Sequence, residues 1–94
     1  MFTLPSKNSV KNTMKGHIKI VGTNDGCDRL KNKSGDGELI YQYHKNYVLN
    51  FQNEDFFIEL QDFIILGDMM EYSAWIGDKN HQYGRIAFQF KPNN

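Results

Sequence analysis

The sequence contains a single cysteine, Cys27, only two prolines and no long run of apolar residues. One thiol excludes an internal disulfide framework and is typical of proteins from a reducing compartment. No stretch approaches the roughly 18–20 apolar residues that a membrane-spanning helix needs. The first residues also lack the charged and apolar segments of a secretory signal. We therefore expect a soluble cytoplasmic protein with no membrane partner.

Motifs of catalysis and metal binding are absent as well. His17, His44 and His81 lie far apart, and no His or Cys spacing matches a zinc site. The sequence has no Gly-x-Ser-x-Gly elbow, phosphate loop or dinucleotide-binding turn. Cys27 has no neighbouring base that would activate its thiol. We expect no enzyme activity, no metal and no cofactor.

Charge is unevenly distributed although the formal net charge is zero. Residues 1–33 carry a net charge of +5, and residues 34–80 carry −7. Such segregation indicates macromolecular partners, because charge distribution governs association more than it governs the fold. The abundance of Asn, Lys and Ile indicates an AT-rich genome, such as that of a virus or a low-GC bacterium. For a viral protein, the compartment would be the host cytoplasm.

The start of the chain is polar and rich in lysine, without apolar periodicity, and we expect residues 1–16 to form a flexible basic arm. Residues 17–94 form one small globular domain, since a chain this short builds only one core. Alternation after His17 predicts a strand with Ile18 and Ile20 on one side. A polar loop rich in turn formers extends from there to Gly37.

The next segment predicts a β-hairpin whose loop consists of residues 44–46, with Asn46 in the left-handed conformation. Its cross-strand pairs are Tyr43 with Tyr47, Tyr41 with Leu49, and Leu39 with Phe51. All six side chains are apolar or aromatic, so one face of this hairpin is expected to be buried.

Residues 53–67 fit both a helix and a strand. As a helix, Asn53 caps the start, Gly67 ends it and the apolar side chains form one stripe. As a strand, Phe56, Ile58 and Leu60 alternate with polar or outward neighbours. We favour the helix. Two strands over residues 69–76 and 85–90 complete the chain, the second with Ile86, Phe88 and Phe90 on its inner face.

The expected fold class is therefore α+β and predominantly antiparallel β, a small five-stranded sheet or partly open barrel with one helix near residues 54–66. The alternative is an all-β fold. The order of three strands, one helix and two strands resembles the small five-stranded barrels that bind oligonucleotides and oligosaccharides. This resemblance lies in element order alone and extends from Gly16 to Phe90.

Function follows from size, segregated charge and the lack of catalytic motifs. We expect a small non-enzymatic binding protein that occupies the surface of a macromolecular protein partner, as an inhibitor, an antitoxin-like protein or an adaptor does. An acidic helix face would attract a basic surface, and an outward-facing Trp75 would anchor it. The expected contact residues are Glu54, Asp55, Glu59, Asp62, Glu71 and Trp75.

The alternative function is a single-stranded RNA- or DNA-binding module on an oligonucleotide-binding type of barrel. Basic side chains would contact phosphates, and tyrosines would stack on bases. The candidate residues are Lys7, Lys11, Lys15, Lys19, Arg29, Lys31, Lys33, Tyr41, Tyr43 and Tyr47. Neither the oligomeric state nor the identity of the partner follows from the sequence.

Overall fold

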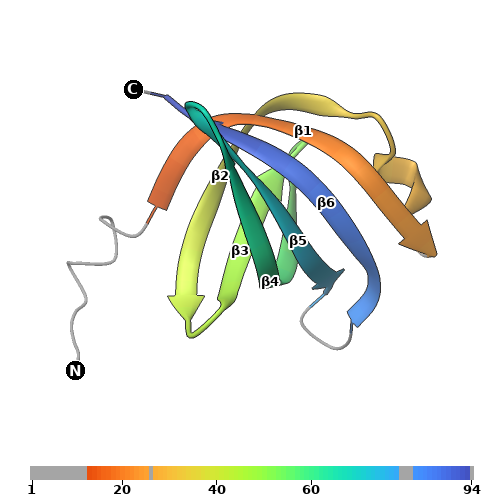
Figure 1. The fold of residues 1–94 in the computed structure, drawn as a ribbon. Helices are drawn as coiled ribbons and strands as arrows, with labels where there is room; N and C mark the ends of the chain where they lie inside the picture. The colour runs from red at the N-terminus through yellow and green to blue at the C-terminus, as the bar shows by residue number, and fades with distance from the viewer. Residues whose placement is uncertain (1–12, 26, 79–81, 94) are drawn as a thin grey trace.

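The computed structural model describes residues 13–25, 27–78 and 82–93, which form a closed barrel of six antiparallel strands (Figure 1). Each strand pairs with the next along the chain, and the last pairs with the first to close the barrel. The strands are β1 (Thr13–Asp25), β2 (Ser34–Tyr43), β3 (Asn46–Phe51), β4 (Glu54–Leu66), β5 (Met69–Gly77) and β6 (Gln82–Pro92). A single 3-10 turn, η2 (Asp28–Leu30), lies between β1 and β2.

The barrel interior is the hydrophobic core, and all six strands contribute to it. Because side chains alternate along a strand, every second residue points inward. Ile18 and Ile20 of β1 are buried, as are Ile86, Phe88 and Phe90 of β6, which confirms the inner faces predicted for these two strands. Each such side chain contributes roughly 1.5–3 kcal/mol relative to its exposure to water. η2 lies beside one end of the barrel and adds the buried Leu30 to this core.

The helix predicted near residues 54–66 is wrong, because this segment is the strand β4. The all-β alternative is confirmed, as six strands form a closed barrel. Phe56 and Ile58 point into the core, as the strand interpretation required. Gly67, expected to end a helix, instead begins the two-residue β4–β5 turn with a φ of 68°. In the described residues no helix lies between the third and fourth strands, so the element order of the oligonucleotide-binding barrels is not found.

The β2–β3 hairpin has a shorter turn than predicted. His44 and Lys45 form the turn, and His44 rather than Asn46 adopts the left-handed conformation, with a φ of 52°. The register shifts at Gln42, between Tyr41 and Tyr43, which indicates a β-bulge.

This bulge keeps Leu39 and Tyr41 on the predicted inner face but changes their pairs. Tyr41 lies opposite Tyr47, and Leu39 lies opposite Leu49. Leu39 and Leu49 are fully buried, whereas Tyr41 is 37% exposed because it lies near the end of the barrel. Tyr43, predicted on the same inner face, lies opposite Asn46 beyond the bulge and is 62% exposed. The inner face of the hairpin was therefore predicted correctly for Leu39 and Tyr41, whereas the register and the position of Tyr43 were wrong.

Two boundaries predicted from the sequence, the end of the N-terminal arm and the limits of the following loop, differ in the structure. β1 begins at Thr13 and pairs with both β2 and β6, so residues 13–16 of the expected arm belong to the barrel. The rest of that arm lies outside the described residues. The long loop expected from Gly22 to Gly37 is also shorter, since β1 continues to Asp25 and β2 begins at Ser34.

Candidate binding surfaces

The predicted acidic helix face does not form, and its carboxylates are distributed along β4 and β5. Arg29 donates two hydrogen bonds to Glu54, at 2.9 and 2.7 Å. Asn50 donates to Asp55 at 2.7 Å, and Gln89 donates to Glu71 at 3.1 Å. These carboxylates are therefore held by neighbours on the barrel surface, and they do not form one continuous acidic stripe.

Trp75 lies on the outer wall of the barrel, as predicted. It alternates with the buried residues Ala74 and Ile76, and 37% of its surface is exposed. Its neighbours across the sheet are Glu59 on β4 and Arg85 on β6. The Arg85 guanidinium lies 5.0 Å from the centre of the indole ring, within the range of a cation–π interaction.

A second exposed aromatic residue lies next to this row. Phe57 on β4 is 41% exposed and pairs with Gly77, which has no side chain to cover it. Since Trp75 is the diagonal neighbour of Phe57, both rings share one part of the wall. Glu59 adjoins them and accepts a hydrogen bond of 3.1 Å from Gln82. We name Phe57, Glu59, Trp75 and Arg85 the Trp75 patch.

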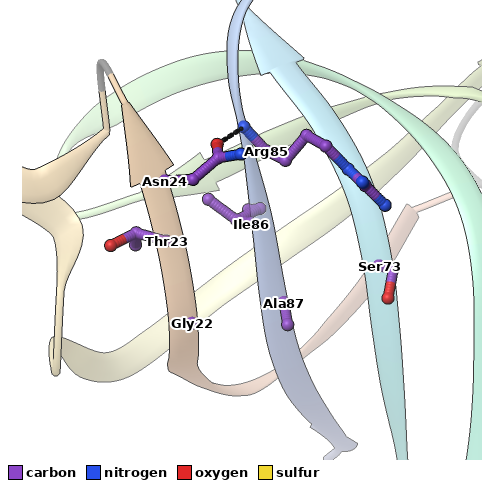
Figure 2. A pocket seen from close by; sticks show the side chains of 7 residues that line it. All are labelled: Gly22, Thr23, Asn24, Ser73, Arg85, Ile86 and Ala87. Atoms are coloured by element: carbon purple, nitrogen blue, oxygen red, sulfur yellow. Dashed lines mark hydrogen bonds between the residues drawn. The ribbon is translucent and has the colours of Figure 1, made fainter.

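A shallow trough of about 190 Å³ borders the Trp75 patch (Figure 2). Its floor consists of Gly22, Ala87 and Ser73, which lie in one row across β1, β6 and β5. Because all three side chains are small, the wall is lower here than at the adjacent rows. Arg85 extends along one side of the trough, and its backbone N–H donates to the Asn24 side chain at 2.7 Å.

A cluster of four consecutive exposed apolar residues lies at the end of the β4–β5 hairpin. Phe63, Ile64, Ile65 and Leu66 are 55%, 57%, 68% and 41% exposed, and we name these four residues the hairpin tip. Exposed apolar patches of this kind mark interaction sites. The exposed tip was not predicted from the sequence, although four consecutive apolar residues cannot all face one core from a strand.

A hollow of about 340 Å³ lies beside the hairpin tip, where β4 separates from the β2–β3 turn. Its apolar lining comes from Tyr47, Leu60, Phe63 and Tyr72. His44, Lys45, Gln61 and Asp62 form its polar rim. Burial within this region raises the pKa of Tyr72 above its ordinary value of 10.0.

Two of the basic residues of the alternative function, Lys31 and Lys33, lie at the opposite end of β2 from Tyr41 and Tyr43, whereas Lys15 pairs with Glu38 nearer to these tyrosines. Lys31 and Lys33 are exposed near η2, at the start of β2, whereas Tyr41 and Tyr43 lie at the end of that strand. The ten residues of β2 separate the two groups by roughly 30 Å of strand. A base stacked on Tyr43 would therefore lie far from these cations.

The other members of that set are placed as follows. Lys15 and Lys19 are exposed on β1, and Arg29 is paired with Glu54. Tyr47 is half-buried against the core, with its ring 5.2 Å from that of Tyr41. Lys7 and Lys11 lie outside the described residues.

Cys27 has a structural environment. Its buried thiol donates to the backbone carbonyls of Asn24 and Arg85, at 2.9 and 3.2 Å.

Within the described ranges, no three His, Cys, Asp or Glu side chains are grouped as metal ligands. A search of the same residues finds no helix with the length and apolar character needed to cross a membrane.

Comparison with known proteins assigns no class to this chain, and the six-stranded antiparallel barrel is known from the structure alone. No family model, curated protein or solved structure matches the chain. The two surfaces described above are therefore the basis for a functional proposal.

Proposed function

We propose that the protein is a small non-enzymatic binding protein that occupies the surface of a protein partner, as an inhibitor or adaptor does, through the Trp75 patch. The observation that carries this proposal is the pair of exposed aromatic residues, Trp75 and Phe57, which lie on the outer wall diagonally across β4 and β5. Trp and Arg are enriched among residues that dominate binding energy, and both are present here. Glu59 and Arg85 supply charge of both signs around the rings, which is typical of the rim of a non-obligate interface.

The trough next to Arg85 gives this surface a concave part that could receive a partner side chain. A partner side chain in the trough would contact Ala87 and Ser73 while its neighbour packs on the indole of Trp75. Because Arg85 is already stacked on the ring, its guanidinium is held in place before binding. Such preorganisation lowers the entropic cost of association. Of the six expected contact residues, Glu59 and Trp75 belong to this surface, and Glu71 adjoins it through Gln89.

The test is affinity capture from a lysate of the source cells, divided into nuclease-treated and untreated halves. We compare the wild type with Trp75→Ala and with Val21→Ala, a control that truncates another exposed apolar residue, 41% exposed on β1. We expect a stoichiometric protein that survives nuclease treatment, with Trp75→Ala reducing its capture at least about tenfold. Val21→Ala should leave capture unchanged.

Two further readouts keep this test specific. Thermal melting of both variants establishes that each is folded. Since Trp75 is the only tryptophan, its emission reports directly on the patch, and titration with the captured partner should shift the emission to the blue. Equal capture by Trp75→Ala would contradict the proposal. Loss of all partners after nuclease treatment would favour the nucleic-acid-binding function instead.

A further inference from the structure

The second half of β4 has a free edge. Pairing between β3 and β4 ends with Asn46 opposite Glu59. The last backbone hydrogen bond on that side runs from the Leu60 N–H to the Lys45 carbonyl, at 2.9 Å. From Gln61 to Leu66, β4 pairs only with β5 within the described part of the chain. An unpaired edge of this length is a template for a further strand.

The hydrogen bonds identify the backbone groups on this edge. The Phe63 N–H donates to the Asp62 carboxylate at 2.8 Å, so it is not used in the β4–β5 ladder. In an antiparallel ladder, alternate residues bond to opposite neighbours. Ile65 therefore presents its N–H and C=O on the same free edge as Phe63. The intervening Ile64 directs its backbone groups to β5.

The side chains along this edge are apolar on both faces of the hairpin. After the bulge at Gln61, Phe63 and Ile65 point to the core side, and Ile64 and Leu66 point to the outer side. All four are at least 41% exposed because the hairpin tip extends beyond Asn46, the first residue of β3. An added strand would therefore cover apolar surface on both faces as well as forming backbone hydrogen bonds.

We propose that the strand that covers this edge is the same segment of a second copy, so that two barrels join β4 to β4 about a two-fold axis at Ile64. In this register Phe63 lies opposite Ile65 of the partner subunit, and each of these pairs exchanges backbone hydrogen bonds, about four in all. Ile64 lies opposite its own copy as a pair without hydrogen bonds. A contact in which the same patch meets itself is the isologous interface of a two-fold dimer.

Charge favours a second copy as the occupant. The register places Asp62 opposite Leu66, so no like charges face each other along the paired strands. The formal net charge of zero leaves no overall repulsion between copies. The partner subunit's β4–β5 turn, with the carboxylate of Asp68, would approach the hollow whose rim holds the cation of Lys45 together with His44, Gln61 and the carboxylate of Asp62. The hairpin tip is also more apolar than the Trp75 patch, as homodimer interfaces are relative to transient ones.

Cysteine cross-linking of the full-length protein tests the register. Opposed residues of a pair without hydrogen bonds have Cα atoms about 4.5 Å apart, within disulfide range. We expect Ile64→Cys to form a disulfide-linked dimer under mild oxidation. Val21→Cys is the matched control at an exposed apolar position away from the edge, and it should remain monomeric. The native Cys27 is buried and should not interfere.

Sedimentation equilibrium over a concentration series tests the association itself. The wild type should dimerise reversibly, and Ile64→Lys should weaken dimerisation at least about tenfold while Val21→Lys leaves it unchanged. A wild type that stays monomeric, or an Ile64→Cys variant that does not cross-link, would overturn the proposal. Preferential cross-linking of Phe63→Cys would overturn the register. This inference is independent of the Trp75 patch, because partner capture by Ile64→Lys is expected to persist.

Discussion

The ion pair between Arg29 and Glu54 links η2 to the first residue of β4. The guanidinium contacts both carboxylate oxygens and also lies 5.3 Å from the centre of the Phe56 ring. The hydrogen bonds from Arg29 lower the pKa of Glu54 below its ordinary value of 4.5, against a smaller opposing effect of burial. Folding therefore favours the ionised form of Glu54.

This shift predicts a pH-dependent contribution to stability. Because the folded pKa lies below the unfolded value, the contribution is present above pH 4.5 and is lost as the pH falls through the folded pKa. Glu54→Gln should lower the free energy of unfolding at neutral pH by less than about 1 kcal/mol, since both side chains are largely exposed. Urea denaturation of both proteins across the acid range measures the difference. Glu38→Gln, at a position outside this ion pair, is the control, and a difference that does not change with pH would contradict the assignment.

Among the elements, β4 shows most clearly why part of the fold could not be predicted from the sequence. The bulge at Gln61 shifts the alternation, so Phe56, Leu60 and Phe63 all point to the core side. Their spacing of four and three residues is also that of one face of a helix. In β6, no register shift falls between Ile86 and Phe90, so Ile86, Phe88 and Phe90 follow strict alternation, and the prediction there was confirmed.

The two candidate surfaces also differ in how far the sequence could predict them. The outward position of Trp75 follows from local alternation with Ala74 and Ile76, so it was predictable. The exposure of the hairpin tip depends on where pairing between β3 and β4 stops, at Asn46 and Glu59. This pairing joins two strands and is not visible in the pattern of either one. Local patterns carry no information about that end point.

The free edge of β4 also contains a protective feature, the bond from the Phe63 N–H to the Asp62 carboxylate. Charged side chains commonly protect edge strands from pairing. Asp62→Ala removes this competing acceptor, so it should tighten dimerisation severalfold in sedimentation experiments. Asp36→Ala is the control, because it removes the same charge from β2, away from this edge, where the Asp36 carboxylate lies 3.9 Å from His17. Weaker or unchanged dimerisation of Asp62→Ala would show that the carboxylate does not protect the edge.

Closure of the whole barrel requires close approach of strands where β1 curves across it (Figure 1). Gly16 and Gly37 face each other between β1 and β2 at this point. A Cβ atom on Gly37 would lie 2.5 Å from the Ile18 Cδ1 atom and 2.7 Å from the Asn50 carbonyl oxygen. A Cβ atom on Gly16 would meet the backbone carbonyl of Lys91. Both strands can therefore approach only because these side chains are absent.

Alanine substitution tests this requirement. Gly37→Ala should lower the free energy of unfolding by about 1–3 kcal/mol, since the backbone of β3 cannot move away without disturbing the barrel. Gly22→Ala is the matched control on β1, because its Cβ would lie 3.6 Å from that of Ala87, an ordinary contact distance. Urea denaturation should show little change for Gly22→Ala. Equal effects of the two substitutions would mean that glycine stabilises these strands through backbone conformation, and that the close approach of β1, β2 and β3 does not limit closure of the barrel.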